Sequence, residues 1–382
     1  MTSQRDSLVD KAAVRDTIKL IKSLPTIRYT HVTDLTRNLT PNQYEQLLLK
    51  IQNNADFNKL RFEYTHSTKQ FGVRVPGPLH RGIVAEFLRR FVIWQTELEK
   101  SNNSVISRTA ETLDIHGNED IKYPALGQEK AKDIKSPDGG IMHECTHKCK
   151  HPALVFEVEF SSKNKEAIKD KARAYITGSK GEIRTVIVVY TGEIHKAERK
   201  NERRLREMYS TGQVDESRLH SYSTDAENVT GEASILIWRA TVMNDNTVAA
   251  IPKFRDATGN AIQSASLNIH LEDCVCKSVM DSAKKCKAPP IEISSEALCS
   301  AIERDLERYR EKRAEIIREQ VEQEKQKKME EAEKENRREE EPLRRATQRR
   351  AHEGVGTSGR VMKRGRLLST RIKGRRPQRE RE

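Results

Sequence analysis

The sequence predicts a mixed α/β fold whose central sheet is covered by helices on both faces. Residues 153–161 alternate in the manner of a strand, and residues 164–177 have the pattern of a helix. Residues 183–190 form a second strand, and two parallel strands joined by a helix lie side by side. The unbroken apolar centre of the second strand, Val186–Val189, is typical of strands buried on both faces.

The N-terminal part of the chain predicts helices followed by a hairpin. Residues 6–24 and 40–54 have helical patterns, and the second begins with Thr40 as N-cap and Gln43 three residues later. Residues 60–75 predict a β-hairpin, because two apolar runs flank a polar turn.

A core helix and a polar stretch follow the hairpin. Residues 79–100 keep one apolar helical face, and Pro78 suits the first helical position. Residues 101–135 are polar and predict irregular structure with one strand at 111–116. Further strands are predicted in the segments ASILIWRATV, VAAIPKF and SASLNIHL.

The last predicted helix begins at a serine cap, Ser294 or Ser295. Its apolar stripe consists of Leu298, Ile302, Leu306, Tyr309, Ile316 or Ile317, and Val321. Beyond this stripe the sequence turns to Glu and Lys, which predicts a projecting charged helix or a disordered run.

These patterns divide the chain into a core and its additions. The predicted parts are a helical N-terminal segment (1–57), a core (58–290) with a charged insertion (192–230), a long charged helix (291–342), and a disordered basic tail (343–382). The tail holds 14 Lys or Arg and 3 Asp or Glu, which is +11 of the net charge of +13. The basic character therefore belongs to the tail and not to the surface of the core.

The composition argues against a secreted or membrane-spanning protein. The first residues are polar and lack the apolar run of a signal peptide, and the longest apolar runs, VIVVY and ILIW, are too short to cross a bilayer. Six cysteines without a secretory signal predict reduced thiols in a nuclear or cytoplasmic protein.

Glu157 and Glu159 lie on the same face of the predicted strand 153–161. One interpretation is that this face is exposed to water, as in many antiparallel sheets. The other is that the face is interior, where carboxylates need a cation, a donor or a proton. A hairpin from Asp138 back into the strand would bring a third carboxylate close, although Pro-Asp-Gly is also an ordinary turn.

The combined pattern is more specific than its parts. It consists of Pro137-Asp138, the strand VFEVEFSS about twenty residues later, a helix with Lys171 and Tyr175, and the strand RTVIVVY. This pattern resembles the PD-(D/E)xK nuclease superfamily, and it looks most like the restriction-endonuclease-like proteins common in fungal and bacterial genomes. The resemblance covers roughly residues 58–272 and implies a mixed sheet flanked by helices.

The resemblance also implies a chemistry. Asp138 and Glu157 would hold Mg²⁺ (or Mn²⁺), Glu159 would assist, and a lysine would serve the water that attacks a DNA phosphodiester. The lysine expected two residues after Glu157 is replaced by Glu159 here. A lysine from the following segment would have to take its place: Lys171 first, with Lys169, Lys163 and Lys165 as rivals. The alternative is a catalytically inactive nuclease fold that serves as a DNA- or chromatin-binding scaffold.

Two further segments suggest ligands. His143, Cys145, Cys149 and His151 have residue types that bind structural Zn²⁺, with Cys274, Cys276 or Cys286 able to complete a site; the alternative is an ordinary surface loop. The basic tail suits nuclear import or loose binding to phosphates through Lys363, Arg364, Arg366, Lys373, Arg375 and Arg376, or it only keeps the protein soluble. The helix 294–341 could bind a protein partner or a second copy of the chain.

Overall fold

A computed structural model describes most of the chain. The described residues are 2–23, 34–52, 57, 60–74, 78–117, 119–125, 128–160, 165–215, 218, 231–240 and 248–353. By internal contacts the chain divides into two units, residues 1–321 and residues 322–382.

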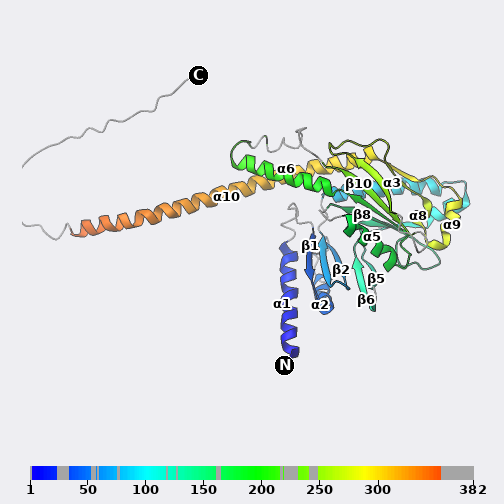
Figure 1. The fold of residues 1–382 in the computed structure, drawn as a ribbon, viewed down its shortest axis with the longest axis horizontal. Coiled ribbons are helices and arrows are strands. Elements are labelled where there is room, and N and C mark those ends of the chain that lie inside the picture. Colours follow the sequence, from blue (N-terminus) through cyan, green and yellow to red (C-terminus); the bar gives the residue numbers. More distant parts are fainter. Residues whose placement is uncertain are drawn as a thin grey trace, which may run out of the picture. The chain divides into compact units, whose positions relative to one another are not determined.

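The predicted strand–helix–strand unit is present in the first unit (Figure 1). Strand β8 (Leu154–Glu159) pairs in parallel with β9 (Thr185–Tyr190), and α5 (Lys165–Gly178) connects them. Every residue of both strands is buried, so the interpretation of the Glu157 face as interior is confirmed.

These two strands belong to a six-stranded sheet of order β11–β10–β9–β8–β7–β4. The other strands are β4 (Leu113–His116), β7 (Gly139–His143), β10 (Ala233–Arg239) and β11 (Val248–Arg255), all paired antiparallel. Strand β4 confirms the strand expected at 111–116. Gly139 lies opposite Phe156, so the hairpin that brings Asp138 back to β8 is confirmed.

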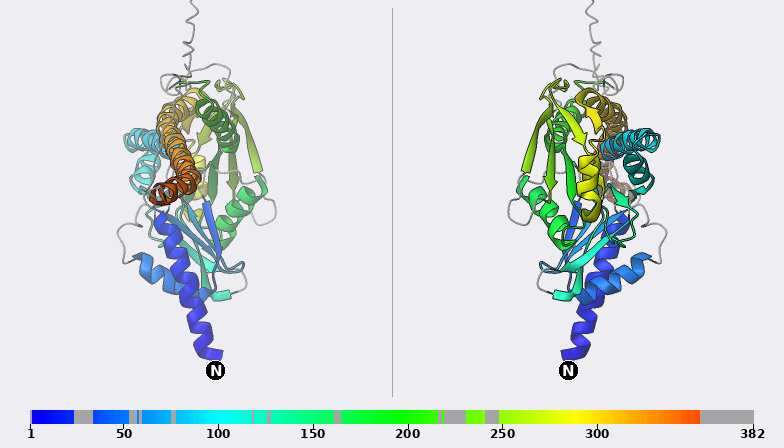
Figure 2. Two further views of the ribbon diagram at one scale, coloured as in Figure 1. Left: turned by 90° about the vertical axis from the view of Figure 1, so that its left-hand side faces the viewer. Right: turned by 90° about the vertical axis from the view of Figure 1, so that its right-hand side faces the viewer.

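Helices cover both faces of this sheet, as Figure 2 shows for α3 (Pro78–Glu99) and α5. On the α3 face, the ring of Phe87 stacks on that of Phe156 with centroids 4.2 Å apart. On the α5 face, Val155 packs with Ala172 and Tyr175. The alternation of β8 therefore sends its phenylalanine toward α3 and its glutamates toward α5.

A second sheet has the order β1–β3–β2–β6–β5. Its strands are β1 (Asp34–Asn38), β2 (Arg61–Thr65), β3 (Gln70–Arg74), β5 (Ile121–Ala125) and β6 (Gln128–Lys135). Strands β2 and β3 are the predicted hairpin. The helices α1 (Thr2–Ser23) and α2 (Pro41–Gln52) confirm two further predictions. The N–H of Thr40 donates to Gln43 Oε1 (2.9 Å) and the N–H of Gln43 to Thr40 Oγ1 (3.3 Å), so the expected capping box is formed.

The prediction of irregular structure over residues 101–135 is wrong. This stretch contains α4 (Ser104–Glu111), which Asn103 caps by accepting from two backbone N–H groups, and it also contains β4, β5 and β6. In β5 the buried residues Ile121, Tyr123 and Ala125 alternate with exposed Lys122 and Pro124. Strand β5, with charged and proline positions between the apolar ones, looks polar in sequence although one of its faces is buried.

The remaining elements surround the six-stranded sheet. Helix α6 (Gly192–Ser210) confirms the helix expected in the charged insertion, and residues 219–230 of that insertion lie outside the described residues. Strand β12 (Ser266–Ile269) was expected, whereas α8 (Leu271–Cys274), α9 (Lys277–Lys285) and β13 (Ile291–Ser294) were not.

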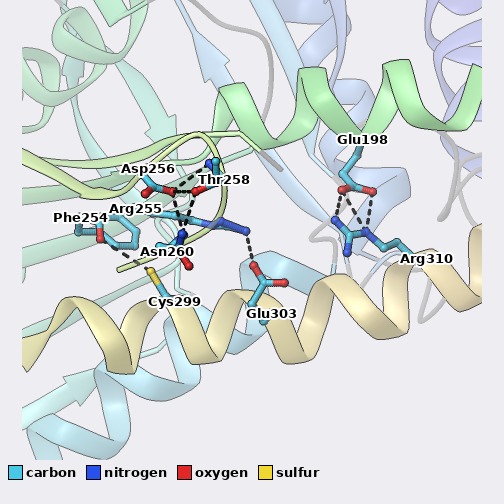
Figure 3. Close-up of polar contacts among 9 residues, drawn as sticks. All are labelled: Glu198, Phe254, Arg255, Asp256, Thr258, Asn260, Cys299, Glu303 and Arg310. Carbon is cyan, nitrogen blue, oxygen red and sulfur yellow. Dashed lines mark hydrogen bonds and ion pairs between the residues drawn. The ribbon is translucent and has the colours of Figure 1, made fainter. Parts of the chain in front are cut away.

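Helix α10 (Ser295–Glu353) begins where the Ala297 N–H donates to Ser294 Oγ (3.3 Å). The expected apolar stripe is buried at Leu298, Ile302, Leu306, Tyr309, Ile317 and Val321. Figure 3 shows how charged pairs reinforce this packing: Arg310 of α10 binds Glu198 of α6, and the buried guanidinium of Arg255 binds Glu303.

In the second unit, residues 322–342 continue α10 as a helix with every side chain exposed. The sequence left two alternatives for this segment, a charged helix or a disordered run, and the structure shows the helix. The basic tail residues Lys363, Arg364, Arg366, Lys373, Arg375 and Arg376 lie outside the described residues. None of the helices in the described part of the chain has the length and apolar character needed to span a membrane.

Candidate active site and thiol cluster

Asp138 lies where the chain passes from one sheet to the other. Strand β6 of the second sheet ends at Lys135, and β7 of the six-stranded sheet begins at Gly139. The carboxylate of Asp138 is buried, and its Oδ2 accepts from the Val158 N–H at 2.7 Å. The Nε2 of His80, in the first turn of α3, lies 2.6 Å from the same oxygen. Two donors from different elements therefore hold Asp138 in one orientation.

Glu157 lies on the neighbouring strand and points toward α5. Its side chain is 4% exposed, and its Oε1 accepts from the Tyr175 hydroxyl at 2.5 Å. The Lys171 Nζ lies 2.9 Å from the same oxygen. A buried carboxylate is costly without a partner, and here a hydroxyl and an ammonium group supply that compensation.

Of the α5 lysines whose side chains the structure describes, Lys171 is the one that reaches the acidic residues. Lys169 is half-buried and forms no ion pair in the described part of the chain. Lys163 and the side chain of Lys165 lie outside what the structure describes. The structure thus brings Lys171 to Glu157, as predicted; whether it acts in a reaction stays a prediction.

Glu63 also contacts Lys171, and sequence reasoning missed it. The Glu63 Oε1 lies 2.8 Å from Lys171 Nζ, and the Glu63 Oε2 lies 3.9 Å from Lys135 Nζ. Glu63 comes from β2 of the second sheet, between Phe62 and Tyr64. The signal that singled out Glu157, a carboxylate among apolar strand residues, was therefore present at Glu63 as well. His80 was missed because it lies 58 residues before Asp138 in the chain.

Together with burial, the carboxylates of this region raise the pKa of nearby tyrosine hydroxyls. Burial raises the pKa of the Tyr123 hydroxyl, and the nearby charges of Asp133, Glu63 and Glu157 raise it further. Glu159 is also buried, and its charge contributes to the raised pKa of Tyr190, for which burial is the main cause. A cation that enters this region would be stabilised by several carboxylates.

The carboxylates do not form a closed three-ligand site. In the described part of the chain, the ligand atoms of Asp138, Glu157 and Glu159 do not all lie within 4.8 Å of one another. One other group of described His, Cys, Asp or Glu side chains meets that criterion. The donor types suit Mg²⁺, which prefers oxygen ligands and needs only one or two protein carboxylates. The role of these residues as metal ligands stays a prediction.

The group with close ligand atoms is His143, Cys145 and Cys276, and these residues could bind a metal ion. His143 ends β7, Cys145 follows it in the β7–β8 loop, and Cys276 precedes α9. The Cys145 Sγ lies 3.5 Å from the Cys149 Sγ, and the Cys276 N–H donates to His143 Nδ1 at 3.4 Å. The predicted fourth residue, His151, does not belong to this group. Its backbone N–H donates to Glu182 Oε2 at 3.2 Å.

The thiols in this cluster differ strongly in pKa. Burial disfavours the Cys145 thiolate, but His147, Cys149 and Cys276 beside it lower the pKa of Cys145 to about 7. Burial and the neighbouring Cys145 and Cys276 raise the pKa of Cys149 to about 12. Contact between Cys145 and Cys149 therefore makes one proton of this pair easier to lose and the other harder to lose.

A scan of the chain against models of known protein families gives no match, and a search of curated proteins gives none either. The functional interpretation therefore depends on the residues and their geometry.

Proposed function

We propose that this protein is a metal-dependent nuclease that hydrolyses phosphodiester bonds of DNA. The observation that carries the proposal is the ion pair between buried Glu157 and partly exposed Lys171. Asp138 lies close by, directly before the adjacent strand β7. Two carboxylates and one ammonium group are what a phosphodiesterase of the PD-(D/E)xK type requires. The strand–helix–strand arrangement and the spacing of these residues support the resemblance to that superfamily.

In this proposal Asp138 and Glu157 hold Mg²⁺ or Mn²⁺, and Glu159 assists. When bound, the metal supplies a water of lowered pKa and offsets the charge that develops on the phosphate. The thiol cluster has no part in the reaction, because thiolates favour softer metals than Mg²⁺.

The protein side chains position the reacting groups. The Val158 N–H and His80 hold the Asp138 carboxylate through one oxygen, Oδ2. Tyr175 and Lys171 hold Glu157 through its Oε1. The Lys171 ammonium group lies between two carboxylates, those of Glu157 and Glu63, and from this place it would orient the attacking water. Orienting a nucleophile in this way removes much of the entropic part of the barrier.

A second function is a DNA- or chromatin-binding scaffold without catalysis. Two observations favour it: Glu159 replaces the strand lysine, and the three carboxylates are more widely spread than a preformed three-ligand site. In that case Lys171 serves only to neutralise Glu157 and Glu63. Both functions predict binding to DNA in the nucleus, supported by the basic tail, and they differ in whether DNA is cut.

The experiment measures cleavage of supercoiled plasmid and of single-stranded DNA by the full chain, with Mg²⁺, with Mn²⁺ and with chelator. We expect metal-dependent cleavage that falls at least about 100-fold in Asp138→Asn, Glu157→Gln and Lys171→Met, because each change removes a group in contact with the reacting atoms.

The matched control is Lys169→Met, which removes a lysine from the same helix that forms no ion pair in the described structure. It should cleave like the parent. Absence of cleavage with either metal, together with DNA binding that survives in all variants, would favour the scaffold. Cleavage that survives in Asp138→Asn would place the active site elsewhere.

A further inference from the structure

We propose that His143, Cys145, Cys149 and Cys276 bind one structural zinc ion, which joins the β7–β8 loop to the segment before α9. Three of these residues already have their ligand atoms within 4.8 Å of one another. The fourth, Cys149, has its Sγ 3.5 Å from the Cys145 Sγ.

The spacing is close to what zinc requires. Zinc binds sulfur at about 2.3 Å and imidazole nitrogen at about 2.0–2.1 Å, so ligands in a tetrahedron lie roughly 3.5–3.8 Å apart. The upper value, about 3.8 Å, applies to two sulfurs, so the 3.5 Å between the Cys145 and Cys149 sulfurs is slightly short, and small side-chain rotations would bring all the ligands to the required spacing. Cys145 and Cys149 are separated by three residues, which is within the spacing common for zinc ligands.

The donor set distinguishes zinc from Mg²⁺. Three thiols and one imidazole are soft or borderline ligands, which hard cations such as Mg²⁺ avoid. All six cysteines of the chain are free thiols in the structure. Zinc takes the place of the thiol protons, so binding would release protons to solvent and would leave three thiolates around one dication.

The other cysteines are separate from this cluster. Cys274 is fully buried among apolar residues of the core, and the Cys299 thiol contacts the Phe254 carbonyl oxygen. Cys286 ends α9 and packs at the edge of the same core. The chain therefore carries matched cysteines inside and outside the proposed site.

The site is structural because it lies far from the candidate active site. Strand β7 has 5 residues, and Asp138 precedes its start whereas His143 ends it. At about 3.3 Å per residue, the two sites are roughly 17 Å apart along the strand. The metal would close the end of the β7–β8 hairpin opposite to the carboxylates and tie it to the segment between α8 and α9.

The first measurement is the metal content of the full chain, purified with a thiol reductant and analysed by mass spectrometry of the elements. We expect about one zinc per chain, since a closed four-ligand site holds one ion. Replacement by Co²⁺ should give the intense absorption bands of a tetrahedral thiolate site. Cys145→Ser and Cys276→Ser should lose the metal, whereas Cys286→Ser should retain it.

A second measurement works without variants, in case the substituted chains do not fold. Alkylation of the parent followed by peptide mass spectrometry should show Cys145, Cys149 and Cys276 protected until a chelator removes zinc, while Cys286 reacts at the same rate with or without chelator. The proposal is overturned if the parent, incubated with excess zinc and then desalted, contains none. Equal reactivity of Cys276 with and without chelator would overturn it as well.

Discussion

Glu157 is held by two donors, and the contribution of each can be measured separately. Tyr175 is fully buried, and its hydroxyl donates to Glu157 Oε1 at 2.5 Å. Hydrogen bonds to charged groups stabilise a fold by about 1.5–3 kcal/mol, which is more than the 0.5–1.5 kcal/mol typical of neutral pairs. The residue is therefore expected to fix the orientation of the carboxylate and to stabilise the fold.

We predict that Tyr175→Phe lowers the free energy of unfolding by about 1.5–3 kcal/mol, because a buried carboxylate loses one of its donors. Urea denaturation measures the change. The control is Tyr64→Phe, which also removes a buried hydroxyl, but one that donates to a neutral acceptor, the Leu39 carbonyl oxygen, at 3.0 Å. It should cost only about 0.5–1.5 kcal/mol. Equal losses in both variants would mean that the Glu157 bond is not charge-assisted.

At the scale of residues, the sequence predicted what local patterns can show. Asp138, Glu157 and Lys171 were predicted because each lies at a definite place in a strand or helix pattern, and the structure places each of them at the junction of the two sheets and α5. Glu63 and His80 were missed because their contacts cross the fold. Nothing in the local pattern of β2 or α3 tells which distant carboxylate or amine each will meet.

At the scale of elements, one buried carboxylate links the short helix α8 to two strands of the sheet, in addition to the apolar packing of Leu271 and Cys274. The carboxylate of Asp273 binds Arg239 of β10 through both oxygens, at 2.7 and 2.9 Å. It also accepts from the Thr185 hydroxyl of β9 at 3.0 Å. Its other donor is the backbone N–H of His270, the N-cap residue of α8. Two strands and one helix therefore share a single buried charge.

These partners determine how Asp273 titrates. Burial alone would raise the pKa of Asp273, but the hydrogen bonds and positive charge of Arg239, with those from His270 and Thr185, hold the pKa below its usual range. A carboxylate with a lowered folded-state pKa stabilises the fold above its unfolded pKa, about 3.9, and this contribution is lost as the pH falls through the folded-state pKa.

We predict that Asp273→Asn lowers the free energy of unfolding at pH 7 by about 1–3 kcal/mol, a range that allows for the partial exposure of Arg239. The difference between parent and variant should shrink below about pH 4, where this carboxylate begins to take up a proton in the unfolded parent chain but not yet in the folded one. Denaturation at several pH values measures it. The control, Asp281→Asn on the exposed side of α9, should change stability by less than about 0.5 kcal/mol. A difference that stays constant down to pH 3 would contradict this assignment.

Elements with strong local signals could be predicted, and those without them could not. The capping box at Thr40 and the serine at 294 mark α2 and α10 because they satisfy backbone groups within a few residues. Gly178 ends α5 for a tertiary reason, because a Cβ there would lie 2.3 Å from the ring of Tyr123. The strands β5 and β6 and the helices α8 and α9 are short, and they owe their form to the larger elements that they cover.

At the scale of the molecule, charge is divided unevenly between the parts. Residues 322–342 contain 6 Lys or Arg and 9 Asp or Glu, whereas residues 343–382 carry a net charge of +11. Neutralising phosphates with Lys and Arg releases counterions, so the affinity for DNA falls with salt in proportion to the number of contacts. If the tail binds DNA, its cations should dominate this salt dependence.

We predict that six tail substitutions to Gln in the full chain weaken DNA binding and make its salt dependence shallower. The changed residues are Lys363, Arg364, Arg366, Lys373, Arg375 and Arg376. The slope of log K against log salt should decrease by at most about 5, since each lost phosphate contact contributes about 0.9. Titrations of one duplex at several salt concentrations measure the slope.

The matched control removes an equal number of positive charges, six, from the acidic helical segment, residues 322–342. Its changed residues are Lys325, Lys327, Lys328, Lys334, Arg337 and Arg338. These cations alternate with carboxylates that repel phosphate, so the slope should change little although the net charge falls as much as in the tail variant. Equal slopes in both variants would show that total charge, and not the tail, governs the interaction. An unchanged slope in the tail variant would mean that the core, and not the tail, contacts the phosphates of DNA. The basic tail would then serve only for solubility or nuclear import.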